Sequence, residues 1–131
     1  MKQNLAIEKT EAQLKKLLFK AGRDRDVLAV IIYGSYARGE EYRDIDVCLV
    51  LNPEARASVF DKRLEYSGHR NIDVNVFQAL PLYMQTRVLK EGVIKLCKDE
   101  DALYDIAIKA VKEFELFKPK YELYLEGVAN G

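Results

Sequence analysis

The segment Val27–Leu51 constrains the fold most, because it holds two apolar runs joined by a short polar stretch. The first run, Val27–Tyr33, is almost continuously apolar and rich in β-branched residues, which predicts a strand covered on both faces. It stops at Gly34-Ser35, where a residue without a Cβ lets the backbone approach a ligand and serine can act as the N-cap of a short helix. The serine hydroxyl and the free N–H groups behind it predict a phosphate-binding turn.

Two aspartates introduce the second apolar run. Successive side chains of a strand alternate between faces, so Asp44 and Asp46 should point the same way. Neighbouring carboxylates repel each other unless a cation lies between them. With a phosphate-binding turn one loop away, the pattern predicts Mg²⁺ carrying a nucleotide. A third aspartate, Asp73, lies in the strand-like run Ile72–Phe77, and a carboxylate inside a strand is costly without a partner.

These residues resemble the signature of the minimal nucleotidyltransferases, small relatives of polymerase-β-type enzymes. The resemblance rests on Gly34-Ser35, Arg38-Gly39, Asp44-Ile45-Asp46 and Asp73. The spacer from Tyr36 to Arg43 has eight residues, fewer than is usual in the family, which we interpret as a shortened loop between helix and strand.

The resemblance implies nucleotidyl transfer from ATP with two Mg²⁺ ions. Asp44 and Asp46 would bind the metal of the triphosphate, and Asp73 would complete the second metal position and help to deprotonate the acceptor. Gly34 and Ser35 would hold the β- and γ-phosphates. These three aspartates are therefore the expected catalytic and metal-binding residues.

Two alternatives stay open at this stage. Arg38 either neutralises phosphate charge or forms an ion pair with Glu40 or Glu41. Taken alone, Asp44-Ile45-Asp46 could also be a strand cap whose charge is paired with the neighbouring Arg43.

Hydrophobic periodicity predicts an α+β fold along the rest of the chain. We expect a small mixed β-sheet with helices packed mainly on one face, as in the nucleotidyltransferase fold, and a single domain over residues 1–131. The expected helices cover Leu5–Ala21 with Gly22 as C-cap, the stretch from Asn52-Pro53-Glu54 to Glu65, Pro81–Glu91, and a last helix from Asp99 that Pro119 should break or kink. Val93–Cys97 should be a short edge strand.

The composition narrows the functional classes. Lys and Arg together number 21, as do Asp and Glu, so the formal net charge is zero, which argues against a general nucleic-acid binder. Cys48 and Cys97 lie in apolar runs and should be buried thiols. We find no apolar stretch long enough to span a bilayer and no signal-peptide core, so we expect no membrane partner and a cytoplasmic location.

The later half of the chain resembles one group within this family, the antitoxins paired with HEPN ribonuclease toxins. The residues concerned are Asp73–Phe77, Leu80-Pro81, Arg87–Val93 and Phe117-Lys118-Pro119. The resemblance implies that the chain transfers AMP to a tyrosine hydroxyl of a HEPN toxin, with which it would form a hetero-oligomer. Aromatic residues near the C-terminus favour a protein interface; they are Phe114, Phe117, Tyr121 and Tyr124.

Two other functions compete with this one. The first is a non-catalytic partner that masks a toxin by binding alone, although such a binder has no use for three clustered aspartates. The second is an antibiotic-type transferase acting on a small molecule, but such enzymes usually need an added helical domain to hold the drug.

Overall fold

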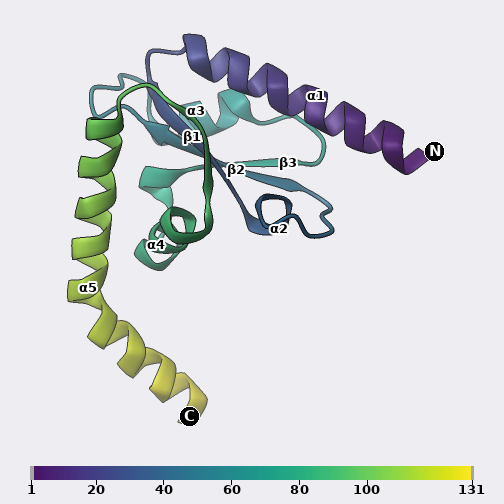
Figure 1. The fold of residues 1–131 in the computed structure, drawn as a ribbon. Coiled ribbons are helices and arrows are strands. Elements are labelled where there is room, and N and C mark those ends of the chain that lie inside the picture. Colours follow the sequence, from purple (N-terminus) through teal and green to yellow (C-terminus); the bar gives the residue numbers. More distant parts are fainter. Residues whose placement is uncertain (1, 131) are drawn as a thin grey trace.

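A four-stranded β-sheet forms the centre of the molecule (Figure 1), with the strand order β3-β2-β1-β4. The computed structural model describes residues 2–130, with side chains for residues 7–129. The strands are β1 (Val27–Tyr33), β2 (Ile45–Leu51), β3 (Ile72–Val76) and β4 (Val93–Cys97). β1 pairs antiparallel with β2 and with β4, whereas β2 pairs in parallel with β3. The mixed sheet and the α+β class are therefore confirmed, as is the edge position of β4.

Helices cover both faces of this sheet. They are α1 (Lys2–Arg23), α2 (Gly34–Ala37), α3 (Val59–Tyr66), the 3₁₀ turn η1 (Phe77–Ala79), α4 (Leu82–Glu91) and α5 (Glu100–Asn130). α1 and α3 pack on one face, and α4 and α5 pack on the other. The expectation that helices lie mainly on one face is therefore wrong. The reason is in the central strands: Val47 contributes to the core under α1 and α3, and its neighbour Cys48 to the core under α4 and α5.

Two helix boundaries differ from the prediction. Gly22 does not end α1, which continues to Arg23. α3 does not begin near Pro53, because Ser58 is its N-cap and accepts a hydrogen bond from the Asp61 amide at 3.1 Å. A side-chain oxygen that satisfies a free amide at the helix start outweighs the preference of proline for the first turn.

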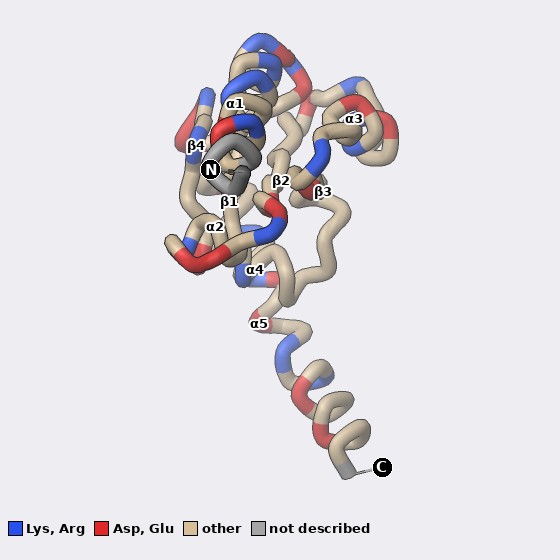
Figure 2. The backbone as a smooth tube through the Cα atoms, turned by 90° about the vertical axis from the view of Figure 1, so that its right-hand side faces the viewer, with Lys and Arg blue, Asp and Glu red and all other residues tan. Residues whose placement is uncertain are grey.

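α5 extends beyond the rest of the molecule. Pro119 lies inside it and does not end it, so of the two predicted effects, a break or a kink, the break does not occur. The helix axis changes direction along its length (Figure 1), in keeping with the kink that proline imposes. The half of α5 nearest the C-terminus projects away from the sheet (Figure 2).

Both cysteines are free thiols. Cys48 is buried and Cys97 is half-buried, which agrees with the prediction for the first and partly for the second. Within the part of the chain that the structure describes, each helix is too short or too polar to cross a lipid bilayer.

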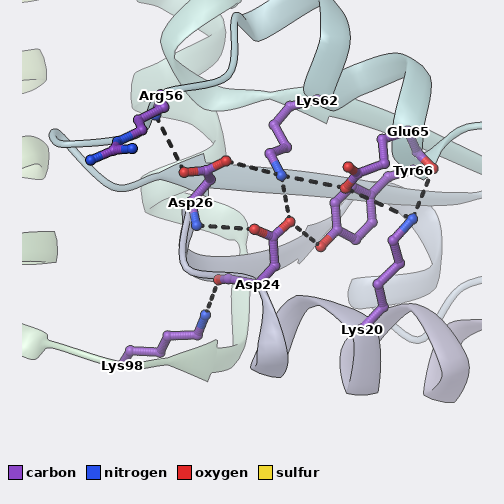
Figure 3. A network of polar contacts seen from close by, with 8 residues as sticks. All are labelled: Lys20, Asp24, Asp26, Arg56, Lys62, Glu65, Tyr66 and Lys98. Carbon is purple, nitrogen blue, oxygen red and sulfur yellow. Dashed lines mark hydrogen bonds and ion pairs between the residues drawn. The ribbon is translucent and has the colours of Figure 1, made fainter.

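A network of charged side chains lies at the start of β1 (Figure 3). At its centre the Lys62 ammonium, with only 5% of the residue exposed, lies 2.7 Å from Asp24, 3.2 Å from Asp26 and 3.4 Å from Glu65. Tyr66 donates its hydroxyl hydrogen to Asp24 at 2.8 Å. We call these five residues the Lys62 network. Burial alone would lower the pKa of Lys62, but its hydrogen bonds to Asp24 and Asp26 raise that pKa to about 12.

Candidate active site

Two of the predicted aspartates lie side by side at the opposite end of β1. Asp46 on β2 and Asp73 on β3 are register partners in the parallel pair, so their backbones are roughly 4.8 Å apart. Their side chains are on the face of the sheet that α4 covers, and both line a cavity of about 420 Å³. Asp46 is half-buried and Asp73 is exposed.

Asp44 is placed differently. It lies one residue before β2, is exposed, and is outside the set of residues that line the cavity. Among the described residues, no three Asp, Glu, His or Cys side chains are already arranged to hold a metal ion. No ion pair joins Arg43 to Asp44 or Asp46 within the described part of the chain, so the strand-cap alternative lacks its partner.

Among the described residues, the site carboxylates Asp44, Asp46 and Asp73 form no ion pair, since the nearby arginines pair with glutamates instead. Burial raises the pKa of Asp46, and the charges of Asp73 and Asp44 raise it further, while Arg38 offsets this only in part. Carboxylate oxygens held together against their own repulsion are the donors that Mg²⁺ prefers. The donor set therefore fits the magnesium that the family implies, with Asp46 and Asp73 as the central pair and Asp44 beside them.

A glycine is required at position 34, because the backbone there lies against the side chain of Asp46. Its φ angle is +79°, in the left-handed region, and a Cβ placed on it would overlap the Asp46 carboxylate oxygen Oδ2. The glycine thus lets the turn approach a site carboxylate. Ser35 is not the N-cap of α2: the N-cap is Tyr33, since the chain already turns at Gly34. Both Gly34 and Ser35 line the cavity, where they were expected.

Arg38 forms the ion pair that one of its two alternatives predicted. Its Nε lies 2.8 Å from a carboxylate oxygen of Glu40, and its Nη1 lies 3.7 Å from Glu91. Glu91 also forms an ion pair with Arg87, whose Nε is 3.5 Å from the same carboxylate oxygen of Glu91. Both arginines line the cavity, so two cations share one acidic partner at its edge.

Sequence reasoning missed several residues of the cavity. Tyr33 accepts a hydrogen bond from the Asn75 amide at 3.1 Å, and burial raises the pKa of its hydroxyl to about 12, so the phenol stays protonated at neutral pH. α4 adds Met84, Arg87 and Glu91. They recur at spacings of three and four residues, so they share one side of the helix next to the buried Val88, and no local signal in the sequence links that side to the site.

Comparison with known proteins agrees with this geometry. The family model described as polymerase beta, nucleotidyltransferase matches residues 13–101, from α1 into the start of α5. A protein of Methanocaldococcus jannaschii, named as a candidate protein adenylyltransferase, is 33% identical over 66 residues, which is 49% of this chain and 51% of the relative. The chain thus matches about half the length of that relative.

Solved structures show the same fold. One chain of a toxin–antitoxin complex crystallised with AMP-PNP superimposes with a TM-score of 0.66 at 16% identity, covering 91% of this chain and 98% of the other. A structure described as a tri-AMPylated Shewanella oneidensis HEPN toxin in complex with an MNT antitoxin gives a TM-score of 0.64 at 14% identity, covering 93% and 98%. Because the family model covers more than half of the sequence, the chain belongs to the polymerase-β-type nucleotidyltransferase family.

Proposed function

We propose that this chain is an adenylyltransferase that moves AMP from ATP to a tyrosine hydroxyl of a HEPN-type toxin and so acts as its antitoxin. The observation that carries the proposal is the pairing of Asp46 with Asp73 beside the Gly34 turn, in one cavity. At about 420 Å³ the cavity has the size of a small-ligand site.

In the proposed reaction the acceptor oxygen forms a bond to the α-phosphorus of ATP. The bond from that phosphorus to the oxygen bridging to the β-phosphate breaks, and pyrophosphate leaves. Asp73, which is exposed, takes the proton of the acceptor hydroxyl and passes it to water. Asp44, Asp46 and Asp73 would hold the Mg²⁺ ions, whose positive charge offsets the charge that develops on the phosphate oxygens.

The phosphates are assigned to the opposite edge of the cavity. Gly34 and Ser35 would hold the β- and γ-phosphates, as the family resemblance implies. Arg38 and Arg87 reach the cavity while paired with Glu91, and an incoming triphosphate would exchange for that carboxylate. Arg87 is thus the second cation that we assign to the triphosphate.

Two relatives support the choice of donor and acceptor. One was crystallised with AMP-PNP, an analogue of ATP, and the complex from Shewanella oneidensis contains an AMPylated HEPN toxin. Both structures share the fold of this chain, and the shared fold makes ATP and a HEPN protein the first substrates to test.

Incubation with α-labelled ATP, Mg²⁺ and the HEPN protein expected to be encoded beside this chain should place label on that protein. Asp46→Asn should abolish the label. Label on RNA ends or an aminoglycoside, with none on the HEPN protein, would refute the protein acceptor. A stable complex without transfer would instead support the non-catalytic alternative.

A further inference from the structure

The half of α5 nearest the C-terminus carries an apolar seam that continues past the body of the protein. Side chains recur at alternating spacings of four and three residues along the helix, as in a helix-packing seam. They are Leu103, Ala107, Ala110, Phe114, Phe117, Tyr121, Tyr124 and Val128. We call these eight residues the α5 seam.

The α5 seam changes its environment along its length. Leu103 and Ala110 are buried against the sheet. Further along, the Tyr121 ring stacks on Tyr83 of α4, with ring centroids 5.7 Å apart. Beyond this point Tyr124 and Val128 are 67% and 63% exposed. The first part of the seam therefore has a partner within the chain, and the last part has none among the described residues.

The total surface also indicates a missing partner. The accessible surface is 9186 Å² for a chain of 15.1 kDa. A compact monomer of this mass exposes roughly 7,100 Å². The excess of roughly 2,000 Å² is larger than the roughly 800 Å² that one partner contributes to a standard protein–protein interface. A projecting helix is only marginally stable by itself in water, so packing by a partner would also stabilise it.

Charge selects the kind of partner. Residues 111–129 carry three lysines and four glutamates, a nearly balanced set. Nucleic acids and anionic membranes require a clear excess of basic residues, which this segment does not have. An apolar seam with balanced flanking charges fits the apolar face of another helix.

The position of the α5 seam links it to the candidate active site. Tyr83, the residue that stacks on the seam, directly precedes Met84, and both Met84 and Leu80 line the site cavity. The exposed end of the seam therefore begins where α5 contacts the helix that lines one side of the cavity. A second copy of the chain would cover the same surface but would not need to lie next to the cavity.

We propose that the exposed end of the α5 seam is the docking surface for the protein that accepts AMP. That protein would pack an amphipathic helix of its own against Tyr124 and Val128. The inference rests on the proposed function and adds to it the surface that holds the acceptor. Tyr124 and Val128 are the residues to test, because they are 67% and 63% exposed and their replacement should change the stability of the fold little.

The experiment compares the double variant Tyr124→Glu/Val128→Glu with the wild-type chain, using the HEPN protein as the probe. The dissociation constant of the complex should rise at least about tenfold, as for residues at the centre of an interface. Labelling of the HEPN protein should fall in parallel, while the thermal shift caused by Mg²⁺ and ATP should stay unchanged. Phe60→Glu is the matched control, because Phe60 is 73% exposed on the other face of the sheet, and it should leave binding intact.

Each result separates the docking surface from the proposed function. Unchanged binding and labelling in the double variant would overturn the docking surface and leave the function standing. If wild-type protein binds the HEPN protein without labelling it, and the double variant loses binding, the docking surface stands and the transfer fails. If the chain alone sediments as a dimer that the double variant dissociates and the HEPN protein does not, the occupant is a second copy and the proposal is overturned.

Discussion

Two groups of three carboxylates lie at opposite ends of β1, roughly 20 Å apart, and they differ in how their charge is balanced. The groups are Asp24, Asp26 and Glu65 in the Lys62 network (Figure 3), and the site carboxylates Asp44, Asp46 and Asp73. In the first group Lys62 contacts all three, and hydrogen bonds from Lys62 and Tyr66 outweigh burial and lower the pKa of Asp24. In the second group burial and neighbouring charges raise the pKa of Asp46. The first group thus has its counter-charge inside the fold, whereas the second has none there among the described residues, which is the basis of the metal site that we propose.

The largest effect should come from removing the cation of the first group. Lys62→Met leaves the partly buried Asp24 and Asp26 and the exposed Glu65 without their shared cation, and the free energy of unfolding should fall by about 3 kcal/mol. Chemical denaturation measures the loss. Lys20→Met is the control, because Lys20 is exposed and lies 3.8 Å from Glu65, and it should cost less than about 1 kcal/mol. Similar losses for both variants would mean that Lys62 is not the central cation.

Supplying a cation to the second group should have the next largest effect. At one hundred times its dissociation constant, ATP with Mg²⁺ should add about 2.7 kcal/mol to the free energy of unfolding. ATP in EDTA should add far less, since the triphosphate then meets the carboxylates with their charge uncompensated. Thermal-shift assays with both mixtures decide the point. Equal shifts in Mg²⁺ and in EDTA would rule out the metal site.

The turn at Gly34 brings the backbone into contact with Asp46, one of the site carboxylates. Gly34→Ala should reduce stability by about 1–3 kcal/mol because of its positive φ, and should also turn the Asp46 carboxylate away, abolishing transfer. Gly39→Ala is the matched control: φ is +72° there, but a Cβ would meet nothing within 4 Å. It should show the stability loss while retaining transfer. Parallel denaturation and labelling assays test both; equal activities would show that the Asp46 contact is unimportant.

Elements with local signals were predictable from the sequence. The apolar run of β1, the proline and glycine that flank α4, and the short run of β4 all agree with the structure, because their determinants are neighbours in the chain. The start predicted for α3 is too early because two start signals compete. Pro53 suits a first turn, but Ser58 bonds an amide of the helix.

In the candidate site, too, the residues with local sequence signals were predictable and those brought in by packing were not. The predicted cavity residues Gly34, Ser35, Asp46 and Asp73 came from short motifs and the alternation of strand residues, and the structure brings them together. The contribution of α4 could not be predicted, because Arg87 and Glu91 reach the cavity only through packing of a distant helix on the sheet. The helices on both faces agree with the apolar run of β1, because a strand without polar residues is covered on each side.

The smallest but most specific test makes the same substitution in both groups. Asp46→Asn removes one of several mutually repelling charges, so the metal-free protein should be as stable as the wild type or up to about 1 kcal/mol more stable. Asp24→Asn removes an acceptor of hydrogen bonds from Lys62 and Tyr66, and should cost about 1–3 kcal/mol. Chemical denaturation of the two metal-free variants at neutral pH shows whether each substitution raises or lowers the free energy of unfolding. A large loss in Asp46→Asn would assign it a structural role.

The pH dependence of the Asp24 variant provides the check on its cause. Since the folded pKa of Asp24 is lowered, its carboxylate contributes stability that is present above about pH 4 and is lost as the pH falls through the folded pKa. The difference between wild type and Asp24→Asn should therefore be largest at neutral pH and shrink in acid, as the wild type protonates the same group. A difference that stays constant down to acid pH would trace the loss to packing rather than to the charge, and the two ends of β1 would then differ in shape and not in electrostatics.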